Sequence, residues 1–181
     1  MSLIDQQLPR YQFSEQHRTR VRASPEEVMR AVATPGRNQS PDRLRDMLMT
    51  LRTVPSRLLG RGVGTLAFTH LASDESETVA GLIGRFWQLD GGLVPTANAG
   101  AFARFSEPRT PKLVIGFRAT LDPKGTLLTT ETRVFCPDRY SLLRFAPYWM
   151  LIRIPSGLIR RRTLRAIRTA AEKKMSADGP A

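Results

Sequence analysis

The chain is poor in the residues from which most catalytic and metal sites are built. It has one cysteine, Cys136, and two histidines, His17 and His70, among 181 residues. A single thiol excludes an internal disulfide and a multi-thiolate metal site. Two histidines with no carboxylates clustered around them predict no metal ion, and the glycine-rich phosphate-binding motifs of nucleotide enzymes do not occur. We therefore expect neither a metal nor another cofactor.

Long apolar runs are scarce as well. No apolar stretch approaches the roughly 20 residues that cross a bilayer, and the residues after Met1 lack the basic-then-apolar pattern of a signal peptide. We expect a soluble, cytoplasmic protein. A chain of 181 residues suits one domain with its own core. We predict a flexible arm over residues 1–12, a single domain over 13–175 and a disordered tail over 176–181.

Positive charge dominates the composition, with a formal net charge of +12. Arginine supplies most of it, because lysine occurs only at Lys112, Lys124, Lys173 and Lys174. Arginines concentrate near the C-terminus, which indicates either a solvated helix face or an anion-binding surface. The candidates for that surface are Arg161, Arg165 and Arg168. We expect at most weak contact with an anionic membrane and no specific nucleic acid.

The N-terminal part of the chain predicts a strand and two short helices. Residues 13–22 alternate between two sides, which indicates a half-exposed strand. A serine, a proline and acidic residues predict a capped helix beginning at Ser24-Pro25, and Ser40-Pro41-Asp42 repeats the device. One side of the strand carries Phe13, Glu15, His17, Thr19 and Val21.

From residue 64 onward the apolar period becomes two, which predicts strands at 65–71, 78–89, 99–106, 112–121 and 126–135. The last third predicts one long amphipathic helix over 139–174, which Pro147 and Pro155 should kink or interrupt. The expected class is α+β: a curved antiparallel sheet of about six to seven strands wrapped around a long C-terminal helix, with two short helices between the first two strands.

Three segments carry a family resemblance: Gly81–Trp87, Thr130–Val134, and Tyr148–Trp149 followed by Ile154–Arg160. With the order of elements they resemble an uncharacterised bacterial branch of the START-like helix-grip superfamily. That superfamily, also called SRPBCC, includes polyketide cyclase-like and lipid-transfer proteins. The resemblance implies a cavity between the sheet and the C-terminal helix for an apolar or amphipathic ligand, and it supplies no catalytic residue.

The candidate lining of such a cavity is apolar and aromatic. The candidates are Phe68, Trp87, Phe102, Ile115, Phe117 and Trp149. The residues that could orient a polar ligand group are His70, Arg85, Glu131 and Arg133, of which His70 and Glu131 are also the candidates for catalysis.

Two of these polar candidates share a strand face, and two interpretations of them remain open. Glu131 and Arg133 either face a cavity or form an external charge pair. Pairing across the turn at 122–125 aligns Phe117 with Thr130, which favours the external pair, although a one-residue shift reverses it. His70 is either a cavity residue or an ordinary hydrogen-bonded core histidine.

Three functions of different classes follow. The leading hypothesis is the binding or transport of a hydrophobic or amphipathic small molecule, lipid-like or polycyclic. The second is a cyclase or aromatase acting on such a ligand, with His70 or Glu131 moving a proton. The third is an interaction module whose basic helix contacts an acidic partner or an anionic membrane.

Overall fold

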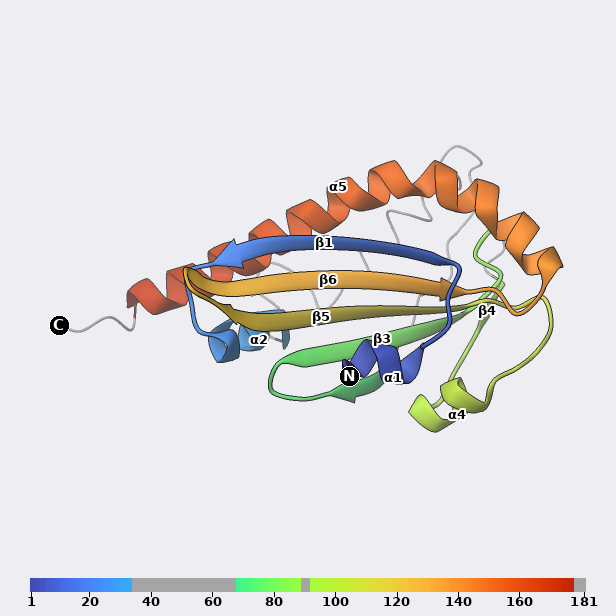
Figure 1. The fold of residues 1–181 in the computed structure, drawn as a ribbon, viewed down its shortest axis with the longest axis horizontal. Helices are drawn as coiled ribbons and strands as arrows, with labels where there is room; N and C mark the ends of the chain where they lie inside the picture. The colour runs from blue at the N-terminus through green and yellow to red at the C-terminus, as the bar shows by residue number, and fades with distance from the viewer. Residues whose placement is uncertain (34–67, 89–91, 178–181) are drawn as a thin grey trace.

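An antiparallel sheet crossed by one long helix forms the frame of the molecule (Figure 1). The computed structural model describes residues 1–33, 68–88 and 92–177. In these residues the sheet has six strands in the order β1-β6-β5-β3-β2, with β4 paired to β3. The expected α+β class is therefore confirmed. The strands are β1 Phe13–Val21, β2 Thr69–Ser73, β3 Glu77–Gly84, β4 Leu93–Val94, β5 Lys112–Asp122 and β6 Gly125–Phe135. The helices are α1 Leu3–Gln7, α2 Pro25–Ala33, α4 Ala99–Arg104 and α5 Arg139–Ala177.

The two longest strands, β5 and β6, form a tight hairpin. Asp122 is the Cα partner of Gly125, and Gly125 has φ 123°, a conformation that favours glycine. This turn sets Phe117 opposite Thr130, as the sequence predicts. The pairing fixes which side chains of β5 and β6 share a face.

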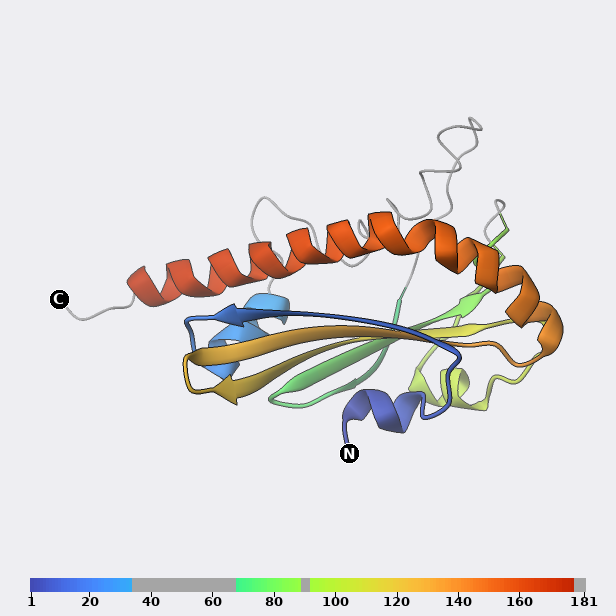
Figure 2. The same ribbon diagram turned by 45° about the horizontal axis from the view of Figure 1, so that its top comes forward.

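Helix α5 runs without interruption from Arg139 to Ala177, with both Pro147 and Pro155 inside it. Asp138, just before the helix, caps it: its carboxylate accepts a hydrogen bond from Ser141 N at 2.7 Å. Figures 1 and 2 show it crossing the sheet lengthwise and bending toward the sheet over its first turns. The helix continues past both prolines because its buried side packs on the sheet over most of its length.

The sheet has an inner face, covered by α2 and α5, and an outer face, which carries α1 and α4. Alternate residues of each strand serve the two faces. The inner face holds two apolar clusters, built around Phe145 and Leu164 respectively. The outer face holds a third, which contains Ile4, Val79, Phe102 and Val114.

Segment 99–106, predicted to be a strand, begins instead with helix α4. The Asn98 side chain caps this helix by accepting from Ala101 N at 2.9 Å. Phe102 is 1% exposed and lies against Gly81, where an added Cβ would stand 2.6 Å from the Phe102 ring. An apolar pattern over only eight residues does not distinguish a strand from a short helix.

The N-terminal arm also differs from the prediction, because residues 3–7 form α1. Ser2 and Asp5 cap it reciprocally. Ile4 and Leu8 are buried against the outer face, which ties the segment to the sheet. Two apolar residues, Ile4 and Leu8, form too short a pattern to predict this helix from the sequence.

Helix α2 begins as predicted. Glu27 N donates to Ser24 Oγ at 3.3 Å, and Val28 is fully buried. The second helix predicted from Ser40 and the first residues of the strand predicted at 65–71 lie outside the described residues.

Candidate functional site

Four polar side chains form a patch on the inner face, where the sheet meets α5. Glu15 and His17 project from β1, and their Cα partners on β6 are Thr132 and Thr130. Residues directly opposite each other in an antiparallel pair have Cβ atoms about 5 Å apart, so the four side chains are neighbours. Both threonines are 1% exposed.

Helix α5 closes over this patch with Gly157 and Arg160. A Cβ added at Gly157 would stand 3.2 Å from Glu15 Oε1 and 3.4 Å from His17 Cε1, so glycine permits the close approach. Arg160 is 3% exposed. Its Nη1 donates to the backbone oxygen of Glu15 at 3.3 Å and lies 4.0 Å from Glu15 Oε2. We call Glu15, His17, Thr130, Thr132 and Arg160 the inner polar site.

The two titratable groups of β1 are directly paired. His17 Nε2 lies 2.7 Å from Glu15 Oε1. If His17 is neutral, Nε2 donates this hydrogen bond; if it is protonated, the contact is an ion pair. In both states the contact fixes the orientation of the imidazole ring.

Four buried atoms of the inner polar site have no hydrogen-bond partner among the described residues: Glu15 Oε2, Thr130 Oγ1, Thr132 Oγ1 and Arg160 Nε. A buried polar group without a partner costs about 1–3 kcal/mol. Such groups are rare in native proteins, and each one calls for an explanation. Their concentration in one site is the most unusual feature of the described structure.

Arg160 is also electrostatically unusual. Its burial lowers the pKa of the guanidinium below the ordinary value, and the neighbouring Glu15 carboxylate opposes that shift. An arginine stays protonated nevertheless. The site therefore keeps a desolvated cation beside a carboxylate that it meets only at 4.0 Å.

The inner polar site lies at the border of the two apolar clusters of the inner face. Thr132 is the partner of Ile115 in one cluster, and Thr130 is the partner of Phe117 in the other. On β1 the residue beyond Glu15 on the same face is Phe13, whose ring stands 5.0 Å from that of Phe145. Several aromatic side chains around this cluster are only partly buried: Phe13, Phe68, Phe86, Trp87 and Tyr148.

Five of the six predicted lining residues belong to these inner clusters. Ile115, Phe117 and Trp149 are buried there, and Phe68 and Trp87 pack at the edge. Phe102 does not join them, because it lies under α4 on the outer face. Its segment is a helix and not the predicted strand, and this helix lies on the opposite side of the sheet from α5.

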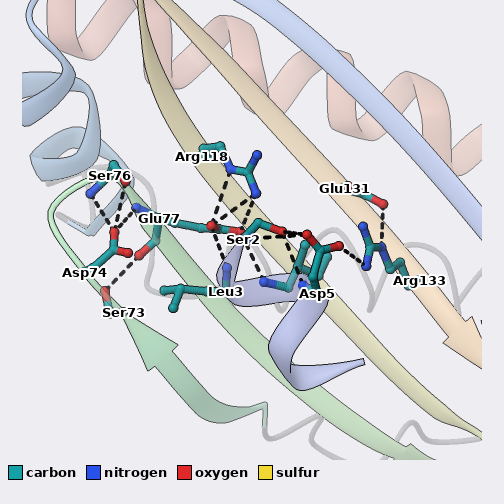
Figure 3. A network of polar contacts seen from close by, with 11 residues as sticks. Ser2, Leu3, Asp5, Ser73, Asp74, Ser76, Glu77, Arg118, Glu131 and Arg133 are labelled. Carbon is teal, nitrogen blue, oxygen red and sulfur yellow. Dashed lines mark hydrogen bonds and ion pairs between the residues drawn. The ribbon is translucent and has the colours of Figure 1, made fainter. Parts of the chain in front are cut away.

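Glu131 and Arg133 lie on the outer face and not beside α5, so the structure supports the external-pair interpretation. Arg133 Nε contacts Glu131 Oε1 at 2.6 Å, and Arg133 Nη1 contacts Asp5 Oδ1 at 2.8 Å (Figure 3). The contact between Arg133 and Asp5 holds α1 on the sheet. The pKa of Asp5 lies far below its ordinary value because it accepts hydrogen bonds from Ser2 and Arg133.

Glu77 is the second anchor of α1 on the outer face. It is 5% exposed and accepts from Leu3 N at 2.9 Å and Ile4 N at 3.3 Å, while Arg118 pairs with it at 3.2 Å. An open pocket of about 100 Å³ lies beside these residues. Its charged lining residues are Glu77, Arg118 and Glu131, all of which are already engaged in ion pairs.

The remaining predicted polar residues are dispersed. His70 is the partner of Ala80 on the inner face, yet its side chain is exposed. Arg85 follows β3 in a turn, where its backbone N–H donates to Gly92 O at 2.8 Å. Neither joins the inner polar site. Arg161, Arg165 and Arg168 are exposed on α5, and Arg168 pairs with Glu172 at 3.0 Å.

The residues of the inner polar site are not those that the sequence analysis selected, although a signal for them exists. The alternation of residues 13–22 already puts Glu15 and His17 on one side with Phe13 and Val21. Arg160 belongs to the arginine-rich run near the C-terminus, and helical periodicity alone does not show which arginine of such a run turns inward. Within the described part of the chain, no group of three or more His, Cys, Asp and Glu residues is placed to hold a metal ion.

No protein-family model and no curated protein matches the chain. Solved structures resemble it only distantly. A protein from Mesorhizobium loti is 16% identical with a TM-score of 0.34, covering 83% of this chain and 98% of that one. A protein from Thermus thermophilus is 9% identical with a TM-score of 0.31, covering 92% of this chain and all of that one. Likenesses of this size carry no argument about function.

Proposed function

We propose that this protein binds an amphipathic small molecule between the sheet and α5. The polar end of the molecule lies at the inner polar site, and its apolar body lies among the partly buried aromatic side chains of the same face. The observation that carries the proposal is the set of four unpartnered buried polar atoms beside an apolar cluster. A ligand that pairs with these atoms removes a cost that the free protein bears.

The chemistry of the unpartnered atoms restricts the polar end of the ligand. Glu15 Oε2 as a carboxylate only accepts hydrogen bonds, Arg160 Nε only donates, and the threonine hydroxyls do both. The matching group offers a donor and an acceptor close together, as a hydroxyl beside a carbonyl does. A simple anion fits less well, because the Glu15 carboxylate would repel it.

The apolar side of the proposal depends on Phe68, Trp87 and their neighbours. These side chains are intermediate in exposure and border the buried cluster around Phe145 and Trp149. Burying their remaining surface against a lipid-like or polycyclic body contributes roughly 25 cal/mol for each Å² of apolar area removed from water. The resemblance to START-like helix-grip proteins supports the same location.

Native mass spectrometry of gently purified protein, followed by organic extraction, tests this function. We expect a stoichiometric adduct whose released molecule is amphipathic. The Thr130→Val, Thr132→Val double variant should lose the adduct, whereas Thr129→Val, on the outer face of the same strand, should retain it. An adduct that survives the double variant unchanged, or native protein that takes up no amphipathic molecule, would contradict the proposal.

The contact between Glu15 and His17 supports a second candidate, proton transfer on the bound molecule. An imidazole held at 2.7 Å by a carboxylate has the arrangement of a general base with its orienting partner. Incubating the extracted molecule with the protein in D₂O tests it. Deuterium incorporation at carbon that His17→Gln abolishes, without loss of binding, would establish catalysis; no incorporation would leave binding alone.

A further inference from the structure

We infer that the outward side of α5 docks on the surface of an anionic lipid bilayer. This surface is separate from the inner polar site, and the inference does not depend on the proposed ligand. Five large apolar side chains on α5 face solvent. Leu143, Met150, Leu151, Ile154 and Leu158, which we call the outward stripe, are each between 57% and 75% exposed.

The outward stripe is a continuous line and not a scatter of single residues. Its members follow one another at helical spacing, with the exposed Pro147 filling the gap after Leu143. The opposite side of the same turns is buried, with Phe145, Trp149 and Ile152 in the core. These turns of α5 are thus apolar on both sides. Only the inner side is covered by the sheet, and exposed contiguous apolar surface of this kind marks an interaction site.

The charge of α5 identifies the occupant. From Arg139 to Ala171 the helix contains no acidic residue. The line of the outward stripe continues at the same spacing into Arg161 and Arg165, both exposed and without an ion pair to any described residue. An apolar face that ends in unpaired arginines is the pattern by which interfacial helices bind anionic lipid.

Other occupants match less of this surface. A nucleic acid would use the arginines but leave the five apolar side chains in water. A second copy of this chain that packed through the same stretch of α5 would cover the apolar residues, but it would offer Arg161 and Arg165 no acidic partner, because this stretch has no acidic residue before Glu172. A bilayer surface matches both parts of this surface, because acyl chains contact the outward stripe and anionic headgroups pair with Arg161 and Arg165. The contact is superficial, since no helix of the described residues is both long and apolar enough to cross a membrane.

Docking of this kind would set the bilayer next to the inner polar site. Ile154 and Leu158 of the outward stripe flank Gly157, whose inner side lies over Glu15. The width of one helix would then separate the lipid from the site. Movement of these turns into the bilayer would therefore also change the cover of the inner polar site.

Vesicle co-sedimentation of the full chain tests the inference. The probes are phosphatidylcholine vesicles with and without phosphatidylglycerol, at low and high salt. We expect binding to the anionic vesicles that weakens with salt. Arg161→Ser with Arg165→Ser should weaken it about 25-fold, since each arginine contributes about fivefold. Ile154→Ser with Leu158→Ser should weaken it by about tenfold or more, from lost apolar burial.

The matched control is Leu121→Ser, because Leu121 is 80% exposed but lies on β5 at the hairpin. It should bind as the native chain does. All substitutions are at exposed positions, and circular dichroism confirms that each variant is folded. Three results would overturn the inference: no binding to anionic vesicles at low salt, unchanged binding by the Ile154→Ser, Leu158→Ser variant, or a dimer in solution that this variant dissociates.

Discussion

Thr126 and Thr132 project from the same face of β6 and are both buried, but only the Thr126 hydroxyl is hydrogen-bonded. It donates to Ala23 O at 2.6 Å. The Thr132 hydroxyl has no partner among the described residues. One strand thus carries a matched pair, in which the same side chain is satisfied at one position and unsatisfied at the other. The pair therefore compares a satisfied and an unsatisfied hydroxyl on one face of the same strand.

The first prediction uses this pair. Thr132→Val should raise the free energy of unfolding of the free protein by about 1 kcal/mol, because it removes an unpaired buried hydroxyl. Thr126→Val should lower it by about 1 kcal/mol, because Ala23 O loses its donor. Urea denaturation with an unchanged m value measures both. If Thr132→Val destabilises the ligand-free protein, its hydroxyl is already satisfied, and the proposed function loses its main support.

The second prediction concerns the buried arginine. Arg160→Met should lower the free energy of unfolding by about 3 kcal/mol, because it leaves Glu15 buried without its cation. Arg161→Met, one residue along the helix and exposed, should change stability by less than about 0.5 kcal/mol. Adding Glu15→Gln to Arg160→Met should restore part of the loss, and a double-mutant cycle measures that coupling. Equal effects of the two arginine substitutions would show that Arg160 is solvated.

The sequence predicts the sheet and the long helix, because these depend on patterns within single segments. The hairpin at 122–125 and the alternation of β5 fix the register, and the register alone puts Thr130 and Thr132 inside and Glu131 and Arg133 outside. The inner polar site cannot be predicted from this register alone. Its members come from β1, β6 and α5, and only the position of Gly157 over Glu15 brings Arg160 inward.

The short helices could not be predicted from the sequence for a different reason. Helix α1 has five residues and α4 has six. At that length neither a helical nor an alternating period can be established. Both helices depend on caps, Ser2 and Asn98, and on a few side chains, among them Ile4 and Phe102, buried against the outer face.

The third prediction tests the anchoring of α1. Glu77→Gln should lower the free energy of unfolding by about 1–3 kcal/mol, because it weakens a buried acceptor of two backbone N–H groups and the partner of Arg118. Hydrogen exchange should show that Glu77→Gln raises the exchange rate in α1 more than in β6, relative to the native chain. Glu75→Gln, at an exposed position in the loop just before β3, is the control. Unchanged protection of α1 would mean that Ile4 and Leu8 suffice to hold it.

The fourth prediction concerns Cys136, which is 3% exposed. Burial raises the pKa of its thiol to about 12. The reactive species is the thiolate, so folded protein at pH 8 should react slowly with a disulfide reagent, and adding denaturant should make the reaction fast. Rapid reaction of the folded protein would show that the end of β6 opens readily.

The same shift predicts a pH dependence of stability. The folded pKa lies above the unfolded one, so the contribution of the thiol to stability is fully present below the unfolded value, near 9. It is lost as the pH rises from there toward about 12, because the unfolded chain releases its proton first. Cys136→Ala should therefore flatten the decline in the free energy of unfolding over this range, relative to the native chain. An identical decline in both proteins would assign the alkaline instability to other groups.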